Sequence, residues 1–439
     1  MMSHKNIIIL VFVLNTFISF SQEQITKKEA VKLALENNYG ILIAKNNQKI
    51  AENNASVFNS GYLPKVIAST GANYNNNNTE NTLQNGTISK VESAESKNIN
   101  ASIGLNYTIF DGFGRSYNYK KLQQSQNLSE LEVKDIIENS LLQIFAMYYE
   151  VARLTEDSDI ISESLNISKQ RLKRANYAFE YGQTTKLQLL NAEVDVNNDS
   201  IQFINIQRLL ANSKRDLNLL LGRNISINFS VETKTSFNHL FELQSLFNKA
   251  KVNNVAIQKL EKNIQLNKFD IQINKSDLLP TLSFNSSYGF NKSDNDATFI
   301  YANQLSKGLN AGLSLNWNVF DGGTTKTRIE NSKIVADNLQ IQKEQIETSI
   351  ERSIANALEI YNNSLFIVQV EEKNVITNQR NFTRTEEQFK LGQITSIEFR
   401  QAQINLLNAQ SNLNNATYVA KNAELLILQL SGELLSQEF

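Results

Sequence analysis

The feature that most constrains this chain is a short segment that occurs twice, each time between a strand-like pattern and a long helical pattern. The first copy reads LNYTIFDGF at residues 105–113, and the second reads LNWNVFDGG and begins 210 residues later, at 315. The same offset separates Gly182 from Gly392 and Gly222 from Gly432. One offset held at three places indicates that a structural unit has been duplicated.

The duplication predicts a first repeat over residues 22–222, a second over 239–439 and an irregular linker at 223–238. Each repeat should hold a helix (25–61 in the first copy), two strands and a long helical hairpin. The chain has only two prolines, Pro64 and Pro280, and each opens a predicted strand, where a missing donor is tolerated. The absence of proline elsewhere suits long helices, because proline inside a helix removes a hydrogen bond and clashes with the preceding turn.

Alternation of apolar and polar residues predicts four strands. The stretch between the first two strands, residues 75–97, is polar, rich in asparagine and without periodicity, so we expect it to be a loop. The predicted strands lie at about 64–75, 99–110, 280–291 and 309–320.

Strands with one apolar face occur in soluble sandwiches as well as in membrane barrels. Two features favour lipid here: the opposite face carries small polar residues, and Tyr107 and Trp317 lie near one end, where interfacial aromatic residues belong. Four strands leave open edges and cannot cross a bilayer alone, so the chain should oligomerise. Eight or twelve strands would both close a barrel.

Residues 1–21 are expected to be a secretory signal peptide. Lys5 precedes an apolar run at 7–20, and Ser19 and Ser21 are small residues before a possible cleavage site. The alternative is a membrane anchor, but this run is shorter than the roughly 20 residues that a spanning helix needs.

Two long helical patterns follow the duplicated segment, from about 115 to 181 and from about 325 to 391. At 1.5 Å per residue, about 67 residues make a rod of roughly 100 Å. Gly182 and Gly392 then predict turns, after which helices of about 38 residues should return. Each repeat should therefore contain a long helical hairpin.

Composition argues against several classes of function. The chain has no cysteine and only two histidines, His4 and His239, so thiolate sites and histidine clusters are not expected. The net charge of −1 gives no basic surface for nucleic acid. With no phosphate loop or nucleophile elbow, we expect no catalytic centre, no metal and no cofactor.

The duplicated segment itself has a structural interpretation. Asp111 and Asp321 should accept hydrogen bonds from free N–H groups at the start of each long helix; a ligand-binding role is the alternative. The glycines allow a sharp turn from strand to helix. The junction residues are Phe110, Asp111, Gly112, Phe320, Asp321 and Gly322.

Together these motifs resemble the TolC-type outer-membrane efflux protein family over essentially the whole mature length. The resemblance rests on ITKKEAVKLALENN at 25–38, GYLP at 61–64, FDG at 110–112 and 320–322, and the glycine turns within 178–193 and 388–403. It implies a mainly α chain with membrane β structure. A long antiparallel α-helical barrel in the periplasm would join a 12-stranded trimeric transmembrane β-barrel, four strands per chain.

The resemblance also implies a function and partners. The chain would be the outer-membrane exit duct of a tripartite efflux or type I secretion system, passing drugs, small toxic solutes or proteins. It would act as a homotrimer in outer-membrane lipid, with a periplasmic adaptor protein and an inner-membrane transporter of the RND or ABC type. The alternative is a periplasmic coiled-coil adaptor, but adaptors resemble one hairpin flanked by compact β domains, and two hairpins are predicted here.

In similar proteins the hairpin tips narrow into a closed aperture and receive the adaptor. The family pattern places a tyrosine, an arginine and two acidic residues around the second glycine, where this chain has Phe389, Ile394, Glu398 and Gln401. An arginine-centred lock is therefore not expected, which leaves apolar packing or another ion pair. The candidate aperture residues are Phe389, Thr395, Glu398, Gln401, Phe179 and Gln188, and the candidate docking tips are Gly182, Gln183, Gly392 and Gln393.

Glu398 raises a question of charge. A ring of three Glu398 carboxylates, one from each chain, would favour cations. The alternative is a glutamate that is simply solvated on a helix face.

Overall fold

A computed structural model describes residues 23–237, 241–295 and 302–437. The predicted signal peptide at 1–21 and His239 lie outside the described residues. The chain divides into two compact units, and each takes segments from both sequence repeats. The helical unit holds residues up to 46, 131–258 and 345 onward; the strand unit holds 47–130 and 259–344.

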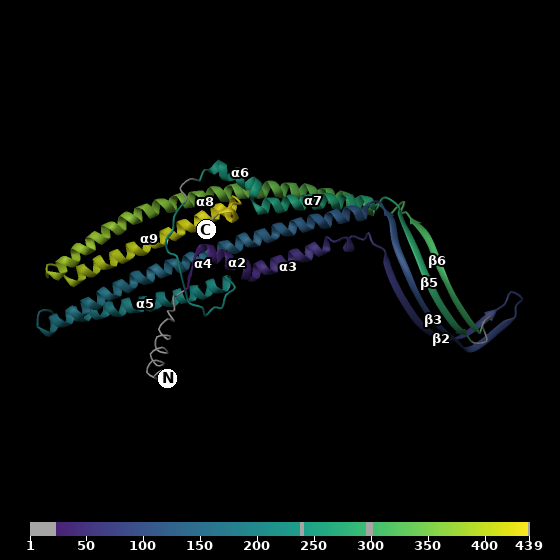
Figure 1. Cartoon of the computed structure of the whole chain (residues 1–439), viewed down its shortest axis with the longest axis horizontal. Coiled ribbons are helices and arrows are strands. Elements are labelled where there is room, and N and C mark those ends of the chain that lie inside the picture. Colours follow the sequence, from purple (N-terminus) through teal and green to yellow (C-terminus); the bar gives the residue numbers. More distant parts are fainter. Residues whose placement is uncertain (1–22, 238–240, 296–301, 438–439) are drawn as a thin grey trace, which may run out of the picture. The chain divides into compact units, whose positions relative to one another are not determined.

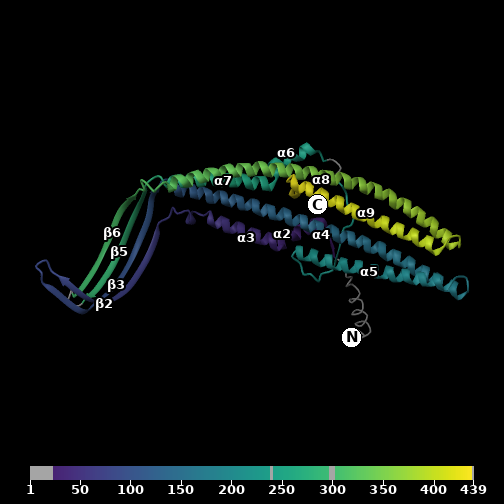
Figure 2. The same ribbon diagram turned by 180° about the vertical axis from the view of Figure 1, so that it is seen from behind.

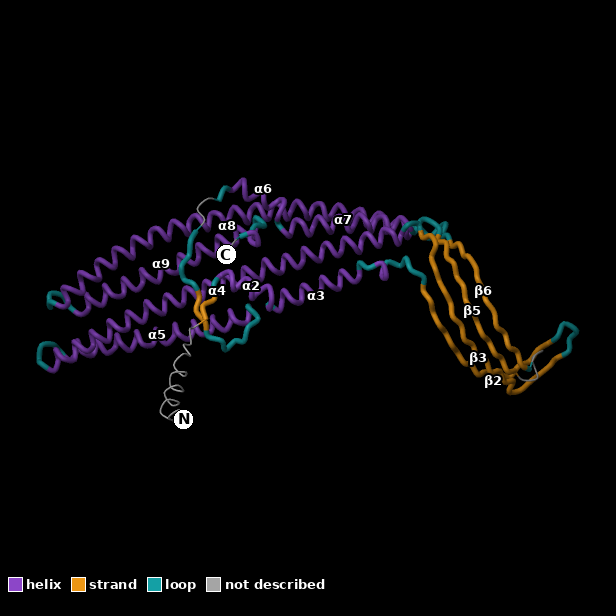
Figure 3. The backbone as a smooth tube through the Cα atoms, viewed as in Figure 1, coloured by secondary structure: helices purple, strands orange, loops and turns teal. Residues whose placement is uncertain are grey.

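The strand unit contains a four-stranded sheet in the order β2-β3-β5-β6, with every neighbouring pair antiparallel (Figures 1 and 3). The mainly helical fold with four strands is thus confirmed. One row across the sheet is Ser69, Ser102, Gly289 and Gly308, and the adjacent row on the opposite face is Ala68, Ile103, Tyr288 and Leu309. The strands are β2 (Lys65–Thr82), β3 (Ile88–Asp111), β5 (Thr281–Asn295) and β6 (Asn303–Asn316).

The predicted loop at 75–97 is wrong. β2 and β3 continue through it as a hairpin that turns at residues 83–87, with Gly86 at φ 81° and one register irregularity between Asn77 and Thr79. Because this extension is largely exposed on both faces except at Ala94, its sequence needs no alternation, and periodicity gave no signal. The backbone pairing carries the strands instead.

β6 also differs from the prediction. It ends at Asn316, before the second FDG segment, so residues 317–323 form a loop, whereas β3 runs to Asp111 in the first copy. The indole of Trp317 donates to the carbonyl of Leu278 at 3.1 Å. Trp317 follows the last paired residue of β6, Asn316, and is not part of the strand ladder. A direct passage from strand to helix is therefore found in the first copy only.

The four long helices form two hairpins. α5 lies along α4 and α9 along α8 in both views (Figures 1 and 2). α4 (Gly114–Glu180) and α8 (Thr324–Lys390) have 67 residues each, and α5 (Lys186–Leu220) and α9 (Ser396–Leu430) have 35 each. Among the described residues, no helix is both long and apolar enough to span a membrane.

The single helix expected at 25–61 is broken at Asn38, and its repeat is broken in the same way at Asn254. The side-chain amides of Asn38 and Asn254 donate to the carbonyls of Leu220 (2.7 Å) and Leu430 (2.9 Å), at the ends of α5 and α9. Both asparagines have an extended backbone, with ψ at 125°, so each ends one helix. The side-chain oxygens of Asn38 and Asn254 accept from the N–H groups of Ile41 and Ala256, so each asparagine also begins the next helix. The helices are α2 (Lys27–Asn37), α3 (Tyr39–Asn54), α6 (Leu243–Asn253) and α7 (Val255–Ser276), and a short 3-10 turn, η1, spans Val57–Asn59.

The duplicated glycines beyond α5 and α9 fit against these breaks. Gly222 and Gly432 have φ values of 66° and 75°. A Cβ at Gly222 would collide with the carbonyl of Asn37, and one at Gly432 with that of Asn253. Glycine is needed both for its backbone conformation and for this close approach.

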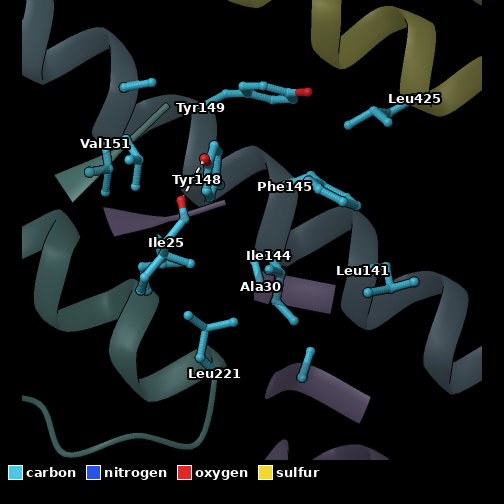
Figure 4. Close-up of a cluster of buried hydrophobic side chains, with 14 of the residues drawn as sticks. Ile25, Ala30, Leu141, Ile144, Phe145, Tyr148, Tyr149, Val151, Leu221 and Leu425 are labelled. Atoms are coloured by element: carbon cyan, nitrogen blue, oxygen red, sulfur yellow. Dashed lines mark hydrogen bonds between the residues drawn. The ribbon is translucent and has the colours of Figure 1, made fainter. Parts of the chain in front are cut away.

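The main core of the helical unit surrounds two tyrosines of α4, Tyr148 and Tyr149 (Figure 4). The Tyr148 hydroxyl donates to the carbonyl of Ile25 and accepts from the N–H of Glu232, both at 2.9 Å. It thereby holds a parallel pair of short strands, β1 (Glu23–Ile25) and β4 (Phe229–Val231). The linker expected to be irregular at 223–238 therefore contains a strand. A terminal 3-10 turn, η2, spans Leu434–Ser436.

Candidate functional site

The two hairpin turns have the same backbone geometry. Gly182 and Gly392 have φ values of 69° and 75°, in the left-handed region. The N–H of Gln183 bonds the carbonyl of Ala178 at 2.7 Å, and the N–H of Gln393 bonds that of Gln388 at 2.9 Å. This is the usual glycine ending of a helix.

The second turn is further held by a capping box between Thr395 and Glu398. The Glu398 carboxylate accepts from the N–H of Thr395 at 2.7 Å and from its hydroxyl at 2.8 Å, and the Thr395 hydroxyl accepts from the N–H of Glu398 at 3.3 Å. The bond from the Thr395 N–H, with that from its side chain, lowers the pKa of Glu398. Glu398 is thus an exposed anion that stabilises the start of α9.

The first turn lacks this box. Thr185 begins α5 without a side-chain cap, and Gln188, the counterpart of Glu398, accepts instead from the hydroxyl of Thr184. Gln401, the remaining polar candidate, donates to Asn405 at 2.8 Å. The two turns are alike in backbone but differ in charge.

Phe389 is held within the chain by other rings. It stacks on Phe399 with 4.7 Å between ring centroids, and the centroid of Phe382 lies 5.5 Å from that of Phe399. The Arg174 guanidinium lies 5.1 Å above the Phe389 ring and donates to the carbonyl of Lys390 at 2.7 Å. Phe179, the counterpart of Phe389, is 38% exposed. Phe389 therefore joins the two hairpins through its contact with Arg174.

Sequence reasoning missed the main polar connection between the hairpins. Arg400 of α9 donates to both carboxylate oxygens of Asp199 of α5, at 2.6 and 2.8 Å, and lies 3.5 Å from Asp195. Ser168 of α4 donates to Asp199 at 2.6 Å. Two contacts complete what we call the inter-hairpin network: Arg171 pairs with Asp195, and Gln403 donates to Ser164 and Ser168.

This network is largely removed from water. Arg171 and Asp199 are each 3% exposed. Burial opposes the charge of Arg400, but the hydrogen bonds and charge of Asp199 outweigh it and raise its pKa. Burial lowers the pKa of Arg171 despite its partner Asp195. Charges buried in this way depend on their partners, because a buried unpaired charge is costly.

A second buried contact joins the hairpins nearer the core. The Asn414 side chain of α9 donates to the carbonyl of Arg153 and to the Asp157 carboxylate of α4, both at 2.8 Å. Arg153 pairs with Asp157 at 2.8 Å. The sequence signal for both contacts is the presence of charged and amide residues on the buried faces of coiled-coil helices. Which helix they face cannot be read from that pattern.

The junction aspartates lie in the strand unit, apart from these contacts. Asp111 accepts from the N–H of Arg115 at 2.9 Å and pairs with its side chain at 3.1 Å. Asp321 accepts from the N–H groups of Gly323 and Thr325, at 3.0 and 2.8 Å. Both carboxylates bind free backbone N–H groups where α4 and α8 begin, as expected of capping residues.

Comparison with known proteins gives consistent matches over most of the chain. The family described as outer membrane efflux protein matches residues 30–223 and 246–433, one segment in each repeat. The outer membrane protein TolC of Vibrio cholerae is 22% identical over 311 residues, 68% of each chain. The toluene efflux pump outer membrane protein TtgC of Pseudomonas putida is 22% identical, over 88% of this chain and 78% of its own.

A solved structure shows the same fold. The CmeC outer membrane channel of Campylobacter jejuni superposes with a TM-score of 0.76 at 17% identity, covering 93% of this chain and 86% of that chain. Because the family match covers both repeats, it includes the hairpins, the tips and all four strands of the sheet in full. The chain therefore belongs to the outer membrane efflux protein family and is an outer-membrane efflux channel rather than an enzyme.

Proposed function

We propose that three copies of this chain form the exit duct of a tripartite export system. The observation that carries this proposal is a sheet with two open edges, β2 and β6, and opposite faces of different polarity. Three such sheets, joined edge to edge, would close a 12-stranded barrel with apolar side chains toward lipid and small polar ones toward the lumen.

The helices support closure by several copies. α5 carries exposed apolar side chains at successive steps of three, four, seven and three residues, which keep to the seam of a coiled coil. These side chains are between 45% and 66% exposed in the single chain, and we infer that a neighbouring copy covers them. They are Leu187, Leu190, Val194, Ile201 and Ile204.

The tips are the proposed meeting point with a periplasmic adaptor, which would connect the duct to an inner-membrane transporter of the RND or ABC type. The docking surface would include Gly182, Gln183, Gly392 and Gln393. Small organic solutes are proposed as one class of cargo, from the likeness to a toluene efflux protein.

We further propose that the tips form the aperture, with Phe389, Thr395, Glu398, Gln401, Phe179 and Gln188 nearest to it. The inter-hairpin network would hold the closed state, because Arg400 ties α9 to Asp199 of α5. This network would supply the ion pair that takes the place of the missing arginine-centred lock.

Edge-to-edge closure can be tested by disulfide cross-linking. The chain has no cysteine, so one cysteine introduced on β2 and one on β6 can pair only where these edges meet. Paired positions along the two edges would be scanned under oxidising conditions in membranes. We expect products up to three chains in size. Absence of cross-links at every register, or a ladder that continues beyond three chains, would refute the trimeric barrel.

A further inference from the structure

Three lysines lie on the apolar face of the sheet, near the end of the strands that is remote from the helices. Lys307 of β6 is opposite Phe290, Lys292 of β5 is opposite Ile99, and Lys97 of β3 is opposite Asp294. From Lys307 to Lys292 and from Lys292 to Lys97, each step moves to the neighbouring strand and two residues farther from the helix end of the sheet. Such diagonal neighbours lie about 7–8 Å apart, within reach of long side chains.

Aromatic rings accompany two of the lysines. The Lys307 ammonium is 5.6 Å from the centre of the Phe290 ring, and the Lys97 ammonium is 5.8 Å from that of Tyr74. Of the two rings, that of Tyr74 is amphipathic, and a tyrosine beside a cationic side chain is typical of the boundary between the apolar core and the headgroups of a membrane.

Two carboxylates share this surface. Lys97 lies 3.7 Å from Glu95, and Lys292 lies 3.3 Å from Asp294. Both pairs are well exposed, with between 42% and 62% of each side chain accessible. Exposed pairs of this kind contribute little to stability, so a group with more negative charge can exchange for them. Three lysines against two carboxylates leave the surface cationic.

A hollow lies beside the lysines on the same face. Its volume is about 380 Å³, and it forms because small residues of β2 and β3 stand next to two large rings of β5. Its outward-facing lining consists of Ala68, Thr70, Ala101, Ile103, Tyr288 and Phe290. Lys307 and Lys292 lie at the end of the hollow that is farther from the helices. Lys307 is the cross-strand partner of Phe290, and Lys292 is two residues after Phe290 on β5.

We propose that the hollow and the three lysines together bind a phosphorylated lipid of the outer leaflet. An acyl chain would occupy the apolar hollow, and phosphate oxygens would contact the ammonium groups. This rests on the proposed function, because the sheet must cross the outer membrane with its helix-free end outward. Neither the hollow nor the lysines alone specify a ligand. An apolar hollow with ammonium groups at one end fits a lipid with an apolar tail and an anionic headgroup.

The test uses delipidated, detergent-extracted protein with diphosphorylated lipid A as the probe, and binding is measured by native mass spectrometry. The variant Lys97→Gln/Lys292→Gln/Lys307→Gln should bind at least tenfold more weakly than the wild type. Ala101→Phe, which fills the hollow and leaves every charge in place, should also weaken binding. Lys65→Gln, at the helix end of β2, is the matched control and should bind as the wild type does.

Three results would overturn the site. One is equal affinity of the triple lysine variant and the wild type. Another is equal binding of lipid A from which both phosphates have been removed. The third is full competition by inorganic phosphate at the concentration of the lipid, which would indicate a phosphate site without a lipid tail.

The proposed function is judged separately, on the trimer mass and bilayer conductance of the wild type in the same preparation. A conducting wild-type trimer whose lipid binding ignores the lysines refutes the lipid site alone.

Discussion

Replacing Asp199 by asparagine should loosen the contact between the two hairpins. Asp199 is 3% exposed and accepts two hydrogen bonds from Arg400 and one from Ser168. Asparagine has nearly the same shape but carries no charge and only one carbonyl oxygen. It therefore removes the bidentate pair and leaves the Arg400 guanidinium with the Ser168 hydroxyl, at 3.1 Å, and with Asp195 as its one remaining carboxylate partner, at 3.5 Å.

The size of the effect follows from burial. Removing one partner of a buried ion pair costs about 3–5 kcal/mol, and we take the lower end, about 3 kcal/mol per chain, because Asp195 remains. If opening separates α9 from α5, this cost falls on the closed state only. Since each 1.4 kcal/mol is a factor of ten, the ratio of the open to the closed state of each chain's contact should rise about a hundredfold.

The assay is single-channel recording in planar bilayers, comparing Asp199→Asn with the wild type. Asp216→Asn, an exposed aspartate on the same helix, is the matched control. A double-mutant cycle with Arg400→Gln should show strong non-additivity, since the two residues form one contact. The reasoning is refuted if Asp199→Asn and Asp216→Asn conduct alike, or if the two effects simply add.

Three further predictions concern single residues. Glu398→Gln should reduce cation selectivity but keep the capping box, because glutamine also serves in such a box. Glu398→Ala should reduce cation selectivity and also lower the thermal stability of the tip. Unchanged reversal potentials in both variants would show that Glu398 does not determine selectivity. Gly222→Ala should lower the free energy of unfolding by at least about 2 kcal/mol, because the new Cβ collides with a neighbour at a residue whose φ is already unfavourable for alanine. Gly182→Ala should lower it by about 1 kcal/mol, because Gly182 has open space around it. Equal losses of stability in thermal unfolding of the two variants would contradict this. Burial raises the pKa of Glu138 to about 7, so the folded state binds this proton more tightly than the unfolded state does. The free energy of unfolding should therefore fall by up to about 3 kcal/mol as the pH rises from 4.5 to 7. Glu138→Gln should flatten this dependence of stability on pH, and a variant with the pH dependence of the wild type would contradict the prediction.

Much of the fold could be predicted because the positions of the helices and strands follow from local sequence patterns. The absence of proline, the glycines at 182 and 392 and the single offset between repeats predict helices that begin and end within a residue of α4 and α8. Alternation also located the apolar rows of the sheet. It failed for residues 75–97, because a hairpin exposed on both faces has no reason to alternate.

The candidate site was less accessible to prediction. The tip residues could be placed by resemblance, but the pattern did not reveal that Glu398 closes a capping box or that Phe389 stacks on Phe399. The inter-hairpin network was missed because Arg400 and Asp199 are 201 residues apart in sequence. Their pairing depends on how α9 rotates against α5, and helical periodicity does not specify that rotation.

The most direct test of the trimeric duct is the mass of the detergent-extracted protein. Light scattering corrected for bound detergent, or native mass spectrometry, should give about 150 kDa, three times the 49.7 kDa of one chain. The same species should migrate as the trimer in gels when unheated and as the monomer after boiling. A well-behaved monomer of about 50 kDa that stays in solution without detergent would contradict the assembly proposed for the sheet edges and the α5 seam.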